Sequence, residues 1–182
     1  MAEQYYELHI AGLTRQLPVM PISEDTAIAG FVILGDTEIV TAVAPELNAK
    51  LPPCDLLVTA EAKGIPLVAE MARLLGHKRY VVARKSMKLY MEDPLIVDVD
   101  SITTAAHQKL YLDGKDAARM KGRRVAIIDD VISTGESLKA QEDLVNTPGG
   151  QIVAKAAILA EGEAIDRQDI VYLEPLPLIP LT

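Results

Sequence analysis

The sequence predicts an α/β fold in which helices cover both faces of a parallel sheet. Short apolar runs alternate along the chain with segments whose apolar residues recur at helical spacing. The apolar runs lack a polar residue at every second position, which is typical of strands that are buried on both faces. This alternation of strands and helices favours a parallel sheet over an antiparallel one.

Seven apolar runs are predicted as strands, at residues 31–34, 55–59, 80–83, 109–112, 124–128, 152–159 and 170–173. Three segments are predicted as helices, at residues 37–51, 64–75 and 136–146. Asp36 stands where the first helix needs an N-cap, and Gly76 stands where the second helix ends. Pro45 predicts a kink in the first helix or its division into two shorter helices.

Three parts of the chain lie outside this alternation. Residues 87–107 have no sustained periodicity and are rich in Asp, Ser and Thr, so we interpret them as a long mobile loop or a loose β-excursion. Residues 1–29 and the Pro-rich residues 175–182 are expected to form a small hood over the edge of the sheet. The chain, residues 1–182, is therefore expected to be a single domain with its core at about residues 30–174.

Composition narrows the classes of function. The formal net charge is −8 and the isoelectric point is about 4.9, which argues against non-specific nucleic-acid binding. The N-terminus is charged and polar where a signal peptide is apolar, and no apolar stretch approaches the ~20 residues of a membrane span. We therefore expect a cytoplasmic protein that binds neither nucleic acid nor membranes. The single cysteine, Cys54, excludes an internal disulfide, and the apolar run after it favours a buried structural thiol.

The segment VAIIDDVISTGESL, residues 125–138, carries the clearest chemical pattern. Its apolar strand delivers Asp129 and Asp130 at the carboxyl end, where ligands bind in open α/β sheets. The loop that follows enters a helix, and its hydroxyls and backbone N–H groups suit a phosphate. The loop residues are Ser133, Thr134, Gly135, Glu136 and Ser137. The alternative is a flavodoxin-like or receiver-like turn with acids at a strand end.

Two more segments follow predicted strands. TAEAKGIP, residues 59–66, is a small-residue turn that opens a helix, although its sequence is also ordinary for a protein surface. ARKSMK, residues 83–88, supplies the local positive charge that an anionic ligand needs in an acidic protein. The alternative for the second segment is a solvated basic turn.

Residues 125–138 resemble the phosphoribosyl-pyrophosphate motif of type I phosphoribosyltransferases, which has four apolar residues, two acids and a Thr-Gly-x-Thr/Ser turn. The resemblance implies the parallel-sheet type I phosphoribosyltransferase fold with a small hood. It implies that Asp129 and Asp130 are catalytic, bind the ribose 2- and 3-hydroxyls and hold the metal directly or through those hydroxyls or water. It also implies that Ser133, Thr134, Gly135, Glu136 and Ser137 cradle the 5-phosphate.

The upstream segments resemble other parts of the same family. Residues 59–66 resemble its pyrophosphate loop, in which Ala62, Lys63 and Gly64 would present backbone amides to the leaving group. Residues 83–88 resemble its cationic pair at the pyrophosphate, which would be Arg84 and Lys85 with Lys88 as a third member.

The purine branch of the family is the nearest resemblance, meaning adenine enzymes and hypoxanthine/guanine-type relatives. It implies transfer from phosphoribosyl pyrophosphate to a purine base, with adenine as the expected base, Mg²⁺ as the cofactor and a homodimer as the assembly. One departure is that residues 97–107 contain no Tyr or Glu, which the adenine enzymes' flexible loop carries. A non-catalytic sensor of phosphoribosyl pyrophosphate or a nucleotide therefore stays open as an alternative.

The two ends of residues 87–107 are expected to lie beside the same site. These residues leave from the Arg84–Lys85 pair and return before the strand that carries the two acids, so both ends lie near one site. We expect them to cover the site during catalysis; the alternative is a β-excursion used in dimer contacts. The histidines His9, His77 and His107 are scattered and are interpreted as structural or solvent-facing, with His107 as the one to test.

Overall fold

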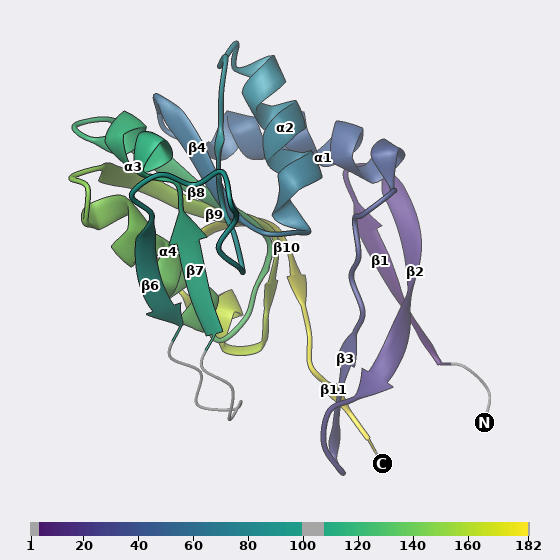
Figure 1. Cartoon of the computed structure of the whole chain (residues 1–182). Helices are drawn as coiled ribbons and strands as arrows, with labels where there is room; N and C mark the ends of the chain where they lie inside the picture. The colour runs from purple at the N-terminus through teal and green to yellow at the C-terminus, as the bar shows by residue number, and fades with distance from the viewer. Residues whose placement is uncertain (1–3, 100–107, 182) are drawn as a thin grey trace.

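The computed structural model describes residues 4–99 and 108–181 of the 182. Its core is a five-stranded parallel sheet with the strand order β10-β9-β8-β4-β5 (Figure 1). The strands are β4 (Leu56–Ala60), β5 (Val81–Ala83), β8 (Arg124–Ile132), β9 (Gln151–Glu161) and β10 (Val171–Leu176). The chain proceeds from β4 to one edge and from β8 to the other, so the strand order reverses between β4 and β8.

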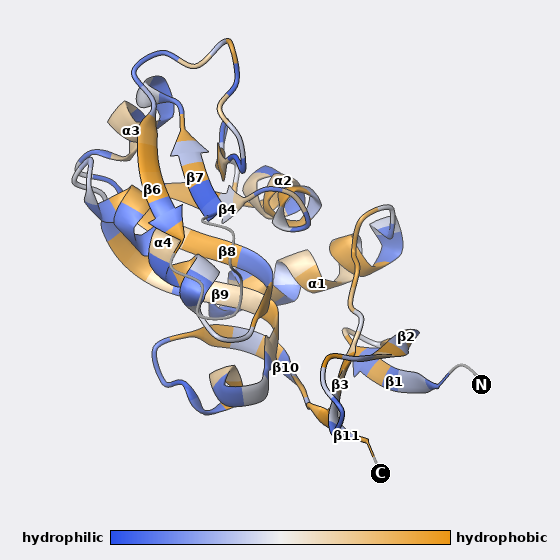
Figure 2. Cartoon of the chain, turned by 60° about the horizontal axis from the view of Figure 1, so that its bottom comes forward, coloured by the Kyte–Doolittle hydropathy of each residue, from blue (hydrophilic) through white to orange (hydrophobic). Residues whose placement is uncertain are grey.

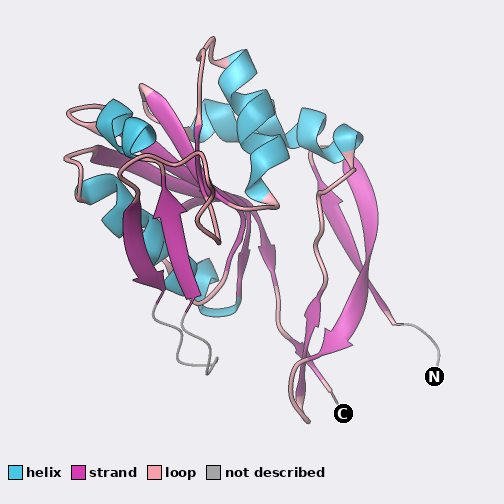
Figure 3. Cartoon of the chain, in the orientation of Figure 1, coloured by secondary structure: helices cyan, strands magenta, loops and turns pink. Residues whose placement is uncertain are grey.

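Helices cover both faces of this sheet, as Figure 3 shows. α1 (Thr37–Lys50) and α2 (Gly64–Leu74) pack on the face that presents Leu57 and Ile128. α3 (Gly114–Met120) and α4 (Glu136–Asn146) pack on the face that presents Val58 and Ile127. The predicted fold class is therefore confirmed. In Figure 2, β6 and β8 are largely hydrophobic and the loops around them largely hydrophilic.

The two ends of the chain form a second sheet of their own. β1 (Tyr5–Ile10), β2 (Leu13–Pro21), β3 (Thr26–Ala29) and β11 (Ile179–Pro180) pair antiparallel in the order β1-β2-β3-β11. We call these four strands the hood sheet, which stands beside the core in Figure 1. The predicted union of the chain ends is confirmed, although β10 extends to Leu176, so residues 175 and 176 belong to the core sheet.

No strands were predicted within residues 1–29, although their sequence contains a signal for them. Leu8, Ile10 and Leu17 are buried and alternate with polar residues along β1 and β2. Ala11 and Gly12 both have positive φ, which is the backbone of the tightest hairpin turns.

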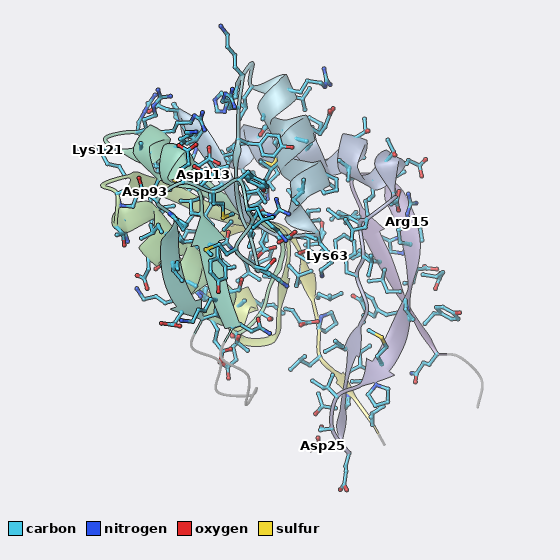
Figure 4. All side chains as sticks on the ribbon, in the orientation of Figure 1. Arg15, Asp25, Lys63, Asp93, Asp113 and Lys121 are labelled. Carbon is cyan, nitrogen blue, oxygen red and sulfur yellow. The ribbon has the colours of Figure 1, made fainter. Side chains whose placement is uncertain are left out.

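β2 is also tied to the core by charge, because the guanidinium of Arg15, labelled in Figure 4, donates to both oxygens of Asp36. Asp36 in turn caps α1 by accepting from the N–H group of Ile39 at 3.1 Å, which confirms the predicted N-cap. The same guanidinium holds the pKa of Asp36 below its usual range.

Part of residues 87–107 is a β-excursion, one of the two structures expected there. β6 (Leu95–Val99) pairs antiparallel with β7 (Gln108–Leu112), and both pack on the face of the sheet that α4 covers. Residues 100–107, including His107, lie outside the described residues. Their expected role in covering the site stays a prediction.

Two sequence predictions are wrong in detail, and one alternative of a third is excluded. Residues 31–34 are not a strand: Phe31 and Ile33 are buried in the core, but the segment is an unpaired linker from β3 to α1. Of the two outcomes predicted for Pro45, division of α1 is wrong, because one helix and its buried face continue across the exposed Pro45. The predicted kink stays a prediction. Cys54 is half-buried, and its partial burial, together with Asp55, raises the pKa of its thiol.

The predicted end of β8 at residue 128 is also wrong. β8 continues through both acids to Ile132, because β9 keeps pairing with it as far as Ile132 and Ala160. No helix in the described ranges is long and apolar enough to cross a membrane.

Candidate active site

A crevice opens in the sheet at the carboxyl end of β4. β4 pairs with β8 only from Leu56 and Val125 to Val58 and Ile127. The remainder of β8 is paired on its β9 side alone, so Asp129 and Asp130 lie in β8 with one flank free. A reversal of strand order such as the one between β4 and β8 is where ligands bind in open α/β sheets.

Asp130 is the more deeply buried of the two acids by solvent exposure. Only 3% of the residue is exposed, and the ammonium of Lys63 lies 2.6 Å from its Oδ2 atom. That oxygen nevertheless makes no hydrogen bond of acceptable geometry to any described residue. Asp130 therefore keeps acceptor capacity for a hydroxyl or another donor that enters the crevice.

Lys63 reaches this position from the loop before α2. Its side chain is 42% exposed, and the same ammonium approaches the carbonyl oxygen of Phe31 at 3.5 Å. In Figure 4, Lys63 lies between the core and the hood sheet. The sequence suggested a backbone role for Lys63, whereas the structure also engages its side chain with one of the two acids.

Asp129 has different surroundings, because neighbouring residues of a strand point to opposite faces of the sheet. Its Oδ1 accepts from the N–H group of Asp130 at 2.9 Å, and its Oδ2 accepts from Nε2 of the buried Gln141 at 3.3 Å. Burial, followed by the charge of Asp130, raises the pKa of Asp129 well above the usual aspartate range.

Glu61 joins the two segments that were expected to bind pyrophosphate. Its carboxylate pairs with the guanidinium of Arg84 at 3.1 Å and accepts from the N–H group of Lys85 at 2.9 Å. These two bonds hold the pKa of Glu61 below its usual range, with Arg84 as the larger cause. The sequence analysis missed Glu61, although an acid between two loops with basic residues was the available signal.

The rest of both segments is placed as follows. A cis peptide bond joins Glu61 to the exposed Ala62. Gly64 begins α2 and lies so close to β4 that a Cβ atom there would be 2.1 Å from Oγ1 of Thr59. The ammonium of Lys88 contacts Oγ of Ser86 at 2.6 Å, and its charge is one of the causes that lower the pKa of Glu61. Its expected role at the pyrophosphate stays a prediction.

The loop from Ser133 to Ser137 delivers the N-terminus of α4 to the crevice. Gly135 has φ +85° and is the N-cap residue of α4, and as a glycine it has no side chain with which to cap the helix. Ser133 and Thr134 are exposed. A helix N-terminus that enters such a site directs N–H groups and a partial positive charge toward an anion.

A cavity of about 330 Å³ separates this loop from the hood sheet. Its walls combine apolar residues of the hood side and the core with Lys63 and the carboxyl group of Glu161. The main apolar residues are Met20, Ile28, Phe31, Val32, Val131 and Leu176. Burial raises the pKa of Glu161, which the sequence analysis had not selected.

The family model of the phosphoribosyl transferase domain matches residues 43–175. The chain belongs to the phosphoribosyltransferase family. The resemblance inferred from residues 125–138 is thus confirmed, as is the expected enzyme class, a glycosyltransferase that moves a phosphoribosyl group.

Similar proteins fall in the purine branch of this phosphoribosyltransferase family. An adenine phosphoribosyltransferase of Mycobacterium avium is 31% identical over 95% of this chain and 92% of its own length. A hypoxanthine/guanine phosphoribosyltransferase of Methanotorris igneus is 35% identical over 80% of this chain and 73% of its own. The crystal structure of an adenine phosphoribosyltransferase from Thermoanaerobacter pseudethanolicus shares the fold, with a TM-score of 0.70 at 24% identity over 87% of this chain and 95% of that one.

One of the two acids, Asp130, fits the magnesium ion that the resemblance to the family implies. The described ranges hold no group of three or more His, Cys, Asp and Glu side chains placed to bind a metal. Both oxygens of Asp129 already accept hydrogen bonds, whereas Oδ2 of Asp130 does not. Mg²⁺ commonly uses one or two carboxylates and completes its shell with water and substrate oxygens.

Proposed function

We propose that this protein transfers the 5-phosphoribosyl group of phosphoribosyl pyrophosphate to a purine base and releases pyrophosphate. The observation that carries the proposal is the convergence of three features on one crevice. These are the carboxylate of Asp130, the N-terminus of α4 behind Gly135 and the apolar cavity beside the hood sheet. The carboxylate suits the hydroxyls of a ribose, the helix N-terminus suits a phosphate, and the cavity suits a flat base.

In this proposal the 5-phosphate accepts from the N–H groups of residues 134–137, and the ribose hydroxyls donate to Asp130. Displacement at C1 passes through an oxocarbenium-like state, so a carboxylate nearby stabilises the positive charge that develops on the sugar. Asp129, fixed by Gln141, orients the same part of β8. No covalent nucleophile is required.

The leaving pyrophosphate meets the loop at residues 62–64 and the cations Lys63, Arg84 and Lys85. Arg84 is already held by Glu61, so its guanidinium is oriented before the donor binds. Magnesium bound with the donor supplies charge neutralisation of the pyrophosphate, and Asp130 is the residue placed to help hold it.

The base enters the cavity between Phe31 and Val131, where apolar side chains exclude water. We propose adenine as the base. Glu161 lines the cavity, and a carboxyl oxygen accepts from an amino group such as the one on C6 of adenine. Hypoxanthine and guanine carry a carbonyl oxygen at that atom, which the ionised carboxylate of Glu161 would repel.

The decisive experiment offers phosphoribosyl pyrophosphate, Mg²⁺ and one base at a time from adenine, hypoxanthine, guanine and xanthine, and measures pyrophosphate release. Adenine should give the highest kcat/KM. Preference for a 6-oxo base would correct the base and leave the reaction class intact. Donor binding without turnover of any base would favour the non-catalytic sensor instead.

We further propose a homodimer. Met87, Leu89 and Tyr90 follow the Arg84–Lys85 pair and are 61%, 109% and 62% exposed, which is unusual for large apolar side chains so close together in a chain. Sedimentation of the wild type and of Leu89→Asp tests this: a dimer that becomes monomeric supports the proposal, and a wild-type monomer contradicts it. A cytoplasmic location stays a prediction from the sequence.

A further inference from the structure

One cation from a distant part of the chain lies against the proposed phosphate loop. Arg167 follows η1 (Gly162–Asp166) and precedes β10. A Cβ atom at Gly135 would be 2.4 Å from Nη1 of Arg167, so the guanidinium lies directly on the residue that precedes α4. The motif at residues 125–138 does not include Arg167, and the sequence analysis did not select it.

Arg167 is held in one orientation by a carboxylate. Its Nε donates to Oδ1 of Asp169 at 2.9 Å and its Nη2 donates to Oδ2 at 2.8 Å. This two-point contact fixes the plane of the guanidinium and leaves Nη1 on the side of Gly135. Asp169 is also paired with Lys155, whose ammonium contacts Glu142 of α4 at 2.9 Å. The network thus joins the Arg167 loop to the body of the helix whose N-terminus it faces.

The proposed phosphate loop, residues 133–137, has no positive charge of its own. Residues 133–137 contain no Lys or Arg and one carboxylate, Glu136, in a chain of net charge −8. A phosphate at the N-terminus of α4 would meet hydroxyls and N–H groups but no full positive charge from the loop itself. Lys63 and Arg84 are already engaged in ion pairs with Asp130 and Glu61.

We propose that Arg167 is a phosphate-binding residue of this site: Nη1 completes the shell of the donor's 5-phosphate, and Asp169 positions the guanidinium. The inference rests on the proposed function, because it assigns a phosphate to the loop at residues 133–137. Arginine suits the task since its planar, always charged group can serve a carboxylate with one edge and a phosphate oxygen with another.

The test compares two ligands by isothermal titration calorimetry on the wild type and on Arg167→Met. Ribose 5-phosphate carries the phosphate in question, and inorganic pyrophosphate does not. Arg167→Met should weaken ribose 5-phosphate by roughly tenfold to a hundredfold, the usual range for one hydrogen bond to a charged group. Pyrophosphate affinity should stay within about twofold. Asp169 keeps its contact with Lys155 in this variant, so the surrounding network retains a partner.

Arg73→Met is the matched control. Arg73 makes the same two-point contact with a carboxylate, that of Glu70, but it does so on α2, outside the crevice. The control changes the net charge equally and should leave both affinities unchanged. Arg167→Lys is a second variant that keeps the charge but loses the fork, and it should bind ribose 5-phosphate with intermediate affinity.

The outcomes separate this inference from the function it rests on. Equal ribose 5-phosphate affinity in the wild type and in Arg167→Met would overturn the role of Arg167 and leave the proposed function standing. Equal weakening of both ligands, or weakening by Arg73→Met, would mean that Arg167 acts only through folding or net charge, which also overturns the role. A wild type that binds neither ribose 5-phosphate nor phosphoribosyl pyrophosphate would overturn the proposed function, and the inference with it.

Discussion

The two ends of the parallel sheet each carry a pair of opposite charges that involves β8, and the two pairs are built differently. At the amino end, Asp55 accepts three hydrogen bonds from Arg124, one from its backbone and two from its guanidinium. At the carboxyl end, Oδ2 of Asp130 forms an ion pair with the ammonium of Lys63 at 2.6 Å. The geometry of this contact is not that of a hydrogen bond, and Oδ2 has no hydrogen bond to any other described residue. Asp55 is partly exposed, whereas Asp130 is almost fully buried.

This difference indicates which pair serves the fold and which serves a ligand. Both carboxylate oxygens of Asp55 already accept hydrogen bonds from Arg124, so this pair serves the fold. A buried carboxylate with spare acceptor capacity costs stability and is usually kept for a reason outside folding. Substitutions at four residues test this difference.

The largest effect is expected at Asp130. Asp130→Asn removes the charge that would face the ribose, so kcat/KM should fall by at least ~100-fold, about 2.7 kcal/mol of transition-state stabilisation. The variant should remain folded, because Asn keeps the shape of the side chain and Lys63 is partly exposed. The measurement is steady-state kinetics beside thermal unfolding. A folded Asp130→Asn enzyme with near-normal turnover would remove Asp130 from the mechanism.

The two ends of α2 give the second prediction. Gly64, at the carboxyl end of β4, has no room for a Cβ atom because Oγ1 of Thr59 would be 2.1 Å away. Gly64→Ala should therefore lower the free energy of unfolding by about 1–3 kcal/mol through overpacking. Adding Thr59→Ala should recover part of this loss, as measured by urea unfolding of the two single variants and the double variant.

Gly76 at the other end of α2 is the control. It has φ +72° and open space around it, so Gly76→Ala should cost stability through backbone conformation alone, about 1–2 kcal/mol. Thr59→Ala should not relieve that cost. If it relieves both variants alike, crowding at Gly64 is not the cause.

These residues also show where sequence reasoning succeeds. The strand that carries Asp129 and Asp130 was predictable because an apolar run with no polar alternation has few other structures open to it. The N-cap at Asp36 was predictable because helix ends depend on local chemistry. Both are properties of a short stretch of chain.

What escaped prediction depends on residues that are distant in sequence. Glu61 matters because β5 brings Arg84 beside it, and Arg167 matters because β9 and β10 return the chain to α4. Phe31 and Ile33 are apolar like strand residues, yet no neighbouring strand is available to pair with them. Pairing partners and loop returns are set by the tertiary fold, so a local pattern contains no information about them.

The third prediction concerns Asp129 and pH. Its raised pKa means that the native state keeps a proton at pH values where the unfolded chain has lost it. The free energy of unfolding should therefore fall as pH rises from about 4 through the raised pKa. Asp129→Asn does not titrate, so its stability relative to the wild type should increase over that window. Urea unfolding between pH 4.5 and 8 measures this, and parallel curves for the two proteins would contradict it.

The smallest effect is expected at Asp55, where the sign of the pH dependence is reversed. Arg124 lowers the pKa of Asp55 to about 2, so the stabilisation from this pair is present above the unfolded value of about 3.9 and is lost as pH falls through about 2. Asp55→Asn should be slightly less stable than the wild type at pH 7, and the two proteins should converge in acid. The loss should be small because the pair is partly exposed and screened by salt. Its kcat/KM should equal that of the wild type, since Asp55 and the crevice lie at opposite ends of β4. A fall in kcat/KM as large as that of Asp130→Asn would mean that the two ends of the sheet are coupled, and that the division between a structural pair and a ligand-facing pair is wrong.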